Sequence, residues 1–254
     1  MLRFASLGSG SRGNATLVEA GGTCVMVDCG FSVSETRRRL ARLGKTSEDI
    51  AAILVTHEHS DHIGGVAAFA RRYGTPVWMT AGTSVMHADT DVPSLDWFTG
   101  HEPFAIGDLQ VAPFTVPHDA REPCQFVFGD GAARLGVLTD TGCITAHIRE
   151  MLDGCDALLL ECNHDTAMLA AGPYPPALKR RVGGRLGHLS NAQAAELLAA
   201  LDTGALRHVV AAHLSDKNNR PELARTALAD ALCCGQDWIG IADQAAGLDW
   251  RQVG

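Results

Sequence analysis

The amino-acid sequence predicts an α/β protein that forms one domain. Short runs with the composition of β-strands alternate along the chain with amphipathic stretches of helical period, which is the pattern of this fold class. Hydrophobic residues make up 46% of the 254 residues and charged residues 20%, enough apolar material for one sizeable core. The sequence contains no repeat, low-complexity tract or linker that would divide it, so we expect a single domain over residues 1–254.

The N-terminal part is expected to form strands joined by glycine turns. A glycine-rich loop and a Gly-Gly pair divide the first apolar runs into three strands, at residues 4–7, 16–20 and 23–28. A helix is predicted over 35–43, with Ser34 as its N-terminal cap and Gly44 at its end. A continuous apolar strand over 51–56 and a helix over 62–73 follow.

The rest of the chain continues this alternation. Apolar runs predict five further strands, at residues 76–80, 109–116, 157–161, 208–212 and 238–242. Residues 124–128 and 133–139 are predicted to pair as a hairpin, because Asp130-Gly131 is a turn sequence. Two helices are predicted, near 191–201 and 221–232. Ser190 and Gln193 fit a capping box at the start of the first of these helices.

Charge and hydropathy limit the classes of ligand and compartment. Twenty-one Lys and Arg against 29 Asp and Glu give a net charge of −8, which excludes a broad basic surface for nucleic acid, so any such contact must be local. Because we see neither a signal-peptide pattern nor a long apolar run, we expect a cytoplasmic protein without membrane contact. The eight cysteines include no CxxC pair and are expected to be free thiols. The sequence gives no indication of oligomeric state.

The strongest chemical signal is a histidine-rich motif directly after a predicted buried strand. Residues 57–62 read His-Glu-His-Ser-Asp-His. Neutral imidazoles and carboxylates are ligands of divalent cations such as Zn²⁺. An exposed histidine-rich loop is the alternative, but four ligand-capable groups at a strand-to-helix junction favour a metal site. The motif is not HExxH, because Asp61 occupies the position of the second histidine.

Three more ligand-capable residues follow other predicted strands. His118, Asp140 and His213 each stand at or just after the end of an apolar run. Each alone would be an ordinary turn residue. All three share the C-terminal end of a strand, where ligands gather in α/β folds, so together they favour a site.

The order of these groups resembles the metallo-β-lactamase superfamily. The resemblance implies a four-layer αβ/βα sandwich with a dinuclear metal site in the groove between its two sheets. It implies that three histidines hold the first metal, His57, His59 and His118. It implies that the second metal is held by Asp61, His62 and His213.

The same resemblance assigns two further carboxylates. Asp140 would bridge the two metals, and Asp28, at the end of the third predicted strand, would support the ligand histidines from behind. A turn carboxylate at a strand end is the alternative for Asp28. We expect this ligand set to bind Zn²⁺, with Mn²⁺ or Fe²⁺ as alternatives.

Later motifs resemble the phosphodiesterase branch of the superfamily, which includes tRNase Z. In that branch a loop histidine is aligned by a glutamate on a neighbouring strand, and here these residues would be His188 and Glu161. The wider pattern resembles the YycJ (WalJ) group of nucleases over nearly the whole chain. Four segments carry this likeness, residues 7–14, 161–165, 187–191 and 213–219.

These residues imply hydrolysis of a phosphodiester. Two metals about 3.5–4 Å apart lower the pKa of a bridging water to about 7, which supplies hydroxide as nucleophile. Asp61 is expected to contribute to catalysis by holding the second of these metals. His188, held by Glu161, is expected to protonate the leaving alkoxide, a contribution typically worth about 10²–10⁴-fold.

Several residues are candidate substrate contacts. The glycine-rich loop over 8–13 matches GxGxxG but precedes a strand, so we expect no dinucleotide site, although its N–H groups could hold a phosphate. A basic stretch over 179–185 could meet a nucleic-acid backbone. The candidates are Ser9, Ser11, Asn14, His164, Arg181, Ser190 and Asn191. Ser190 is expected to act as a helix cap and not as a nucleophile. For His164 and Asp165, capping of a short helix and substrate contact are equally weighted alternatives. Surface or core positions are expected for the remaining histidines, His87, His101, His147 and His208.

We therefore expect a metal-dependent phosphodiesterase, and the resemblance implies a DNA exonuclease, with RNA as a second substrate. The short segments from 118 to 140 and from 140 to 213 leave no room for a tRNA-gripping arm or the extra domain of RNase J-type enzymes. One alternative is hydrolysis of a small ester, thioester or cyclic phosphodiester, although a thiolate would not need His188 as an acid. A metal-stabilised nucleic-acid-binding regulatory protein is the other alternative.

Overall fold

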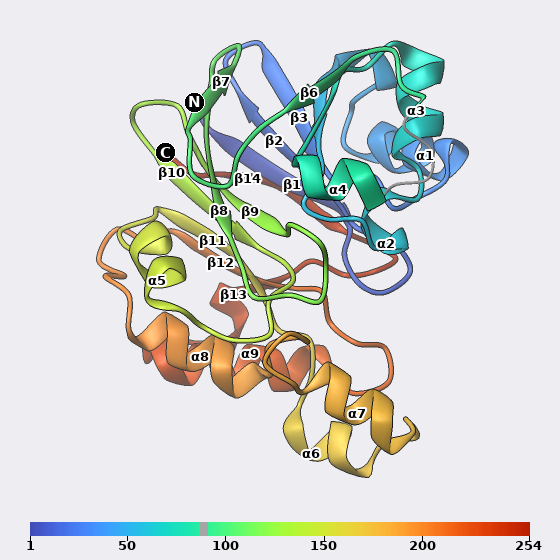
Figure 1. The fold of residues 1–254 in the computed structure, drawn as a ribbon. Helices are drawn as coiled ribbons and strands as arrows, with labels where there is room; N and C mark the ends of the chain where they lie inside the picture. Colours follow the sequence, from blue (N-terminus) through green and yellow to red (C-terminus); the bar gives the residue numbers. More distant parts are fainter. Residues whose placement is uncertain (87–90) are drawn as a thin grey trace.

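The computed structural model describes residues 1–86 and 91–254 and contains two β-sheets that pack face to face (Figure 1). The first sheet is formed by β1 (Arg3–Gly8), β2 (Ala15–Ala20), β3 (Thr23–Val27), β4 (Ile50–Leu54), β5 (Val77–Met79), β6 (Leu95–Trp97) and β14 (Leu248–Gln252). Its strand order is β14-β1-β2-β3-β4-β5-β6. The strands from β14 to β3 pair antiparallel, and those from β3 to β6 pair parallel.

The second sheet repeats this half-antiparallel, half-parallel plan. It is formed by β7 (Phe104–Ile106), β8 (Leu109–Thr115), β9 (Cys124–Gly129), β10 (Arg134–Leu138), β11 (Ala157–Glu161), β12 (His208–Ala212) and β13 (Ile239–Ile241). Its strand order is β13-β12-β11-β10-β9-β8-β7. The strands from β10 to β13 pair parallel, and those from β7 to β10 pair antiparallel.

Helices cover the outer face of each sheet, so the predicted αβ/βα layering is confirmed (Figure 1). The longer helices are α1 (Val33–Arg42) and α3 (Val66–Tyr73) on the first sheet and α5 (Ala146–Leu152), α8 (Asn191–Ala199) and α9 (Pro221–Leu232) on the second. The shorter ones are α2 (Ser60–Ile63), η1 (Ser47–Asp49), α4 (Ala81–Met86), α6 (Thr166–Ala171), α7 (Pro176–Val182) and η2 (Gln236–Trp238). In Figure 1 helices α6 and α7 project together from one end of the molecule. No helix in the described ranges combines the length and hydropathy that crossing a membrane requires.

Three apolar clusters fill the three interfaces between the four layers. Because successive side chains of a strand point to opposite faces, Val25 lies in the core between the sheets while Met26 packs on the helices of the first sheet. On the second sheet, Leu159 lies in the core between the sheets, whereas Leu158 packs on the helices of that sheet. Continuous apolar strands are thus explained by burial on both faces.

Most predicted elements are confirmed, and the start of one helix and the start of one strand need correction. The helix predicted over 35–43 is α1, but its cap is Ser32, whose Oγ accepts a hydrogen bond from the Glu35 N–H at 3.4 Å. Ser34, the predicted cap, already lies in the helix. The strand predicted over 238–242 begins later, because a 3₁₀ turn precedes β13. His87 lies outside the described residues, whereas His101 is exposed and His208 is half-buried.

The helix predicted over 62–73 is interrupted at Gly64 and Gly65, which separate α2 from α3, while its predicted end before Gly74 is confirmed. Gly65 donates from its N–H to the Cys29 carbonyl at 2.7 Å. A Cβ at position 65 would overlap the Phe31 carbonyl oxygen. Two backbones therefore approach here more closely than any residue with a side chain allows.

A second glycine lets the end of the histidine motif dock by its backbone. The Asn14 N–H donates to the Asp61 carbonyl at 2.7 Å, and the Cys29 N–H donates to the His62 carbonyl at 2.8 Å. A Cβ on Gly30 would overlap the same Asp61 carbonyl. These backbone bonds fix where α2 presents its side chains.

Gly30→Ala is expected to unfold at a markedly lower temperature than the wild type, since the added methyl group displaces the Asp61 backbone. A loss of about 2 kcal/mol or more in the free energy of unfolding is expected from such a clash. Gly235→Ala is the matched control, because its φ is −73° and a Cβ there meets no atom within 4 Å. Calorimetric unfolding of both variants with equal losses would contradict the docking role of Gly30.

Candidate metal centre

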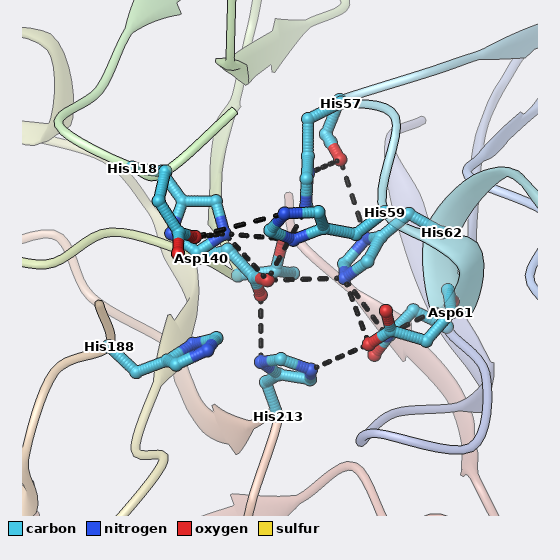
Figure 2. Close-up of polar contacts among 12 residues, drawn as sticks. His57, His59, Asp61, His62, His118, Asp140, His188 and His213 are labelled. Atoms are coloured by element: carbon cyan, nitrogen blue, oxygen red, sulfur yellow. Dashed lines mark hydrogen bonds and ion pairs between the residues drawn. The ribbon is translucent and has the colours of Figure 1, made fainter. Parts of the chain in front are cut away.

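The seven predicted metal ligands converge at one edge of the two sheets (Figure 2). The motif at 57–62 follows β4 of the first sheet, while His118, Asp140 and His213 follow β8, β10 and β12 of the second. All four strands end at this edge, as expected for ligands gathered at the C-terminal ends of strands. The centre therefore lies across the junction of the two sheets.

The first ligand group comprises three histidines and one carboxylate. One ligand atom from each of His57, His59, His118 and Asp140 lies within 4.8 Å of the others. The Nε2 atoms of His57 and His118 lie 3.5 and 3.6 Å from Asp140 Oδ2. Three imidazoles and a carboxylate at such separations match the donor set of a tetrahedral Zn²⁺ site.

The second group lies on the other side of Asp140. Asp61, His62 and His213 also offer ligand atoms within 4.8 Å of one another. Asp61 Oδ2 lies 3.3 Å from His213 Nε2 and 3.5 Å from His62 Nε2. Because Asp140 Oδ2 lies 3.2 Å from His62 Nε2 as well as near His57, this carboxylate touches both groups.

The protonation state of His57 fits a cation in the first group. Burial, followed by the neighbouring His62, lowers the pKa of His57 well below its usual value, so the imidazole is neutral. Its Nε2 atom is buried and has no hydrogen-bond partner among the described residues. A buried nitrogen lone pair without a partner is costly, and a divalent cation is the partner that this donor set accepts.

The carboxylates of the centre are in the ionised form that binds cations. Burial opposes ionisation of Asp61, but contacts with His213 and His62 outweigh it and hold the Asp61 pKa well below its usual range. Burial also opposes ionisation of Asp140, and the same two histidines lower the pKa of that carboxyl. The centre thus holds two carboxylates in their anionic form at neutral pH.

Hydrogen bonds behind the centre fix the ring orientation of the ligand histidines. Thr56 Oγ1 donates to Asp28 Oδ2 at 2.9 Å and lies 2.9 Å from His57 Nδ1, from which it can accept. His62 Nδ1 donates to Asp28 Oδ2 at 2.7 Å. His118 Nδ1 donates to a backbone carbonyl at 2.9 Å. In each case the Nε2 atom is left facing the centre.

Asp28 lies where the resemblance implied, in direct contact with His62 and connected to His57 through Thr56. It is buried, and its backbone φ of 61° is a conformation that non-glycine residues adopt at a cost. His213, with a φ of 53°, shares this conformation. Such strain persists only where surrounding contacts enforce it, and it gathers at functional sites.

His188 faces the centre and is held by Glu161 at the end of β11. Its Nδ1 donates to Glu161 Oε1 at 2.7 Å, while Glu161 Oε2 accepts from the N–H groups of Thr141 and Leu189 at 2.9 and 3.2 Å. Burial lowers the pKa of His188, but the Glu161 carboxylate outweighs it and raises the pKa above its usual value. The His188 ring lies 5.3 Å from that of His213 (Figure 2).

A groove of about 330 Å³ opens over the centre. Its wall combines centre residues with residues of α7 and the preceding loop, and consists of Ser11, His59, Ser60, Asp61, Asp119, Asp140, Asn163, Tyr174, Leu178, Arg181, Val182, Gly187, His188, His213 and Ser215. The predicted candidates Ser11 and Arg181 are therefore available to a substrate. Arg181 Nε donates to Asp119 Oδ2 at 2.6 Å.

Two other substrate candidates are buried behind the ligands and need correction. Ser9 Oγ accepts from the His213 N–H at 2.9 Å and donates to Asn14 Oδ1 at 3.1 Å. Asn14 Nδ2 lies 3.3 Å from Asp61 Oδ2 and 3.1 Å from His62 Nε2. Their bonding partners are within the protein, so they position ligands. The glycine-rich loop likewise directs its N–H groups at positions 10, 12 and 13 inward, which disfavours a phosphate site there.

The remaining candidates, His164, Ser190 and Asn191, are also buried outside the groove wall. Ser190 forms the predicted capping box with Gln193. Asn191 Nδ2 donates to Asn219 Oδ1 at 2.9 Å. The cap of α6 is Asp165, next to His164. Of these three side chains, Asn191 connects the segment after His188 to the segment after His213.

Sequence reasoning missed one residue behind the centre, Thr56, and several residues around the groove. Thr56 carries no chemical signal except its place before the motif. Asn163 donates from Nδ2 to the His213 carbonyl at 3.0 Å, and it lies inside a segment already noted for its resemblance. Asp119, Tyr174 and Leu178 enter the groove through tertiary structure.

The chain is similar to known proteins in sequence and in fold. Residues 23–214 match the family model of the beta-lactamase superfamily domain. The chain is 36% identical over 235 residues to Exodeoxyribonuclease YycJ of Bacillus anthracis, covering 91% of this chain and 89% of the relative. It is 33% identical over 245 residues to Exodeoxyribonuclease WalJ of Streptococcus pneumoniae serotype 2, covering 94% and 91%. In fold it matches the metallo-beta-lactamase fold protein YhfI from Bacillus subtilis with a TM-score of 0.76 and 14% identity, over 99% of this chain and 100% of that chain.

Thr56→Val is expected to weaken metal binding, because the isosteric side chain cannot connect Asp28 to His57. Loss of such an orienting bond typically costs about 10–100-fold in metal affinity. Titration of the metal-free protein with Zn²⁺ against a chelating dye measures the change. Thr36→Val is the matched control, since Thr36 is a buried hydroxyl in α1 that donates to the Ser32 carbonyl. Equal affinities in the two variants would show that Thr56 plays no part in orienting the ligands.

Proposed function

The chain belongs to the metallo-β-lactamase superfamily and is a metal-dependent hydrolase, and from this we propose that it is a phosphodiesterase that removes nucleotides from the end of DNA. The observation that carries the proposal is the His188–Glu161 pair beside two adjacent ligand groups in an open groove. The name exodeoxyribonuclease, borne by two relatives that match most of this chain, supports DNA as the polymer and an end as the point of attack.

Two divalent cations are the proposed cofactor, with Zn²⁺ as the ion that best matches the histidine-rich donors. His57, His59 and His118 would hold one ion, and Asp61, His62 and His213 the other, with Asp140 shared between them. When bound, such ions polarise a phosphoryl group and lower the pKa of a coordinated water. Asp28 and Thr56 keep the rings of His57 and His62 directed at the centre.

His188 is proposed as the general acid. Hydrolysis adds water across one ester P–O bond, and the departing alkoxide must gain a proton. Since Nδ1 of His188 bonds to Glu161, its remaining nitrogen Nε2 is the one available to the groove. Glu161 raises the pKa of His188, so the imidazole keeps a proton to deliver.

The same pair disfavours thioester hydrolysis and a role in binding alone. A thiolate leaves without protonation, so thioester hydrolysis would not need His188 as a general acid or Glu161 to orient it. A regulatory protein that only binds nucleic acid would not need an acid beside an accessible metal centre.

Incubation of the zinc- or manganese-loaded protein with end-labelled DNA and RNA tests the proposal. We expect stepwise shortening of DNA from one end, slower shortening of RNA, and loss of both when a chelator removes the metal. Asp61→Ala is expected to lose metal and activity together. Brisk thioester hydrolysis without any cleavage of polynucleotides would contradict the proposal.

The role of His188 is tested by changing the leaving group. His188→Ala is expected to keep its metal and to lose about 10²–10⁴-fold in kcat on DNA. It should lose far less on bis(p-nitrophenyl) phosphate, because nitrophenolate leaves without a proton. Equal losses on both substrates would exclude His188 as the acid.

A further inference from the structure

Asp119 is a carboxylate of the groove wall that lies beside the first ligand group and that the proposed chemistry does not use. Its Oδ1 atom lies 3.6 Å from Nε2 of His118 and 3.8 Å from Nε2 of His59. These distances are close to those of Asp140, whose Oδ2 lies 3.5 and 3.6 Å from Nε2 of His57 and His118. A carboxylate so near two ligand histidines is within reach of a cation that they hold.

An ion pair nevertheless holds the Asp119 carboxylate outside the ligand group. Arg181 Nε, on helix α7, donates to Asp119 Oδ2 at 2.6 Å. Within residues 1–86 and 91–254, Asp119 joins no group of three or more ligand atoms that all lie within 4.8 Å of one another. A guanidinium and a divalent cation both attract a carboxylate, so Arg181 competes with the first metal ion for Asp119.

The backbone on both sides of the Asp119 side chain is fixed by hydrogen bonds. The Asp119 N–H donates to the Leu186 carbonyl at 2.9 Å. Two residues further on, the Arg121 N–H donates to Glu58 Oε1 at 2.7 Å. Rotation of the Asp119 side chain alone therefore decides whether its carboxylate faces Arg181 or the ligand histidines.

We propose that Arg181 restrains Asp119 from becoming an additional ligand of the first metal ion, and thereby keeps a coordination position open to the substrate. This inference rests on the proposed function, because it concerns the metal centre assigned there. Catalytic metal sites keep such a position open, whereas structural sites are closed by protein ligands. A further carboxylate on the ion would raise the affinity for metal and exclude the phosphoryl group.

The test compares Arg181→Ala, Asp119→Asn and the double variant with the wild type by titration of the metal-free proteins with Zn²⁺. Arg181→Ala is expected to bind one of its two ions about 3- to 10-fold more tightly, because breaking a partly exposed ion pair no longer opposes coordination. The double variant is expected to bind Zn²⁺ as the wild type does, since the asparagine amide carries no charge. The Arg181 side chain is 60% exposed, so its removal leaves no buried cavity.

Co²⁺ in place of Zn²⁺ gives a readout of the ligands themselves. The visible d–d bands of Co²⁺ lose intensity when its coordination number rises, so they should weaken in Arg181→Ala and recover in the double variant. The kcat on bis(p-nitrophenyl) phosphate should follow the same pattern, with a loss in Arg181→Ala that the added Asp119→Asn change partly restores.

Arg180→Ala is the matched control, because Arg180 is the neighbouring exposed arginine of α7 and lies outside the groove wall. Equal Zn²⁺ affinities and Co²⁺ spectra in Arg181→Ala and Arg180→Ala would overturn the restraint. Loss of Zn²⁺ affinity in Asp119→Asn alone would also overturn it, since Asp119 would then already be a ligand.

The metal readouts need no substrate, which separates this inference from the proposed function. If Zn²⁺ affinity and Co²⁺ spectra follow the expected pattern but the wild type cleaves no polynucleotide, the restraint stands and the proposed function fails. If the wild type shortens DNA but Arg181→Ala binds Zn²⁺ as the wild type does, the restraint alone fails.

Discussion

The centre depends on one buried carboxylate, Asp140, and on the histidines that surround it. Oδ1 of Asp140 lies 2.7 Å from His213 Nδ1, and Oδ2 lies 3.2–3.6 Å from Nε2 of His62, His57 and His118. Taking a carboxylate out of water is expensive unless charge and hydrogen bonds compensate for the loss of hydration. Since Asp140 ends a strand of the second sheet while His57 and His62 follow a strand of the first, this compensation requires the two sheets to be packed together.

Two other buried carboxylates, Asp28 and Glu161, also form hydrogen bonds with histidines around the centre. Asp28 orients His62 and, through Thr56, His57, whereas Glu161 orients His188. In the proposed function the first arrangement would serve metal binding and the second proton delivery. Each carboxylate is itself fixed by backbone N–H groups, Asp28 by that of Thr56 and Glu161 by those of the loops that follow β10 and precede α8. The rigidity of the centre thus derives from the loops at one edge of the sheets.

The sequence was most informative where chemistry is encoded locally. The motif at 57–62 and the strand-end residues His118, Asp140 and His213 led to a ligand set that the structure brings together, because strand ends of one sandwich necessarily meet at one edge. Predictions failed where a contact with a part of the chain distant in sequence determines the local structure. The helix break at Gly65 depends on the loop after β3, and the burial of Ser9 behind His213 depends on the packing of the two sheets.

Short elements were equally inaccessible to sequence reasoning. Strands β6 and β7 have three residues each, too few for a periodic pattern, and β14 is recognisable chiefly by its pairing with β1 at the other end of the chain. The place of α7 beside the groove follows from the fold and from the ion pair between Arg181 and Asp119.

The central proposal is that two metal ions would share Asp140. Anomalous diffraction from a crystal of the metal-loaded protein, recorded at the absorption edge of the bound metal, tests it most directly. We predict two peaks about 3.5–4 Å apart, one on each side of the Asp140 carboxylate. One peak alone, or two peaks without Asp140 between them, would contradict it.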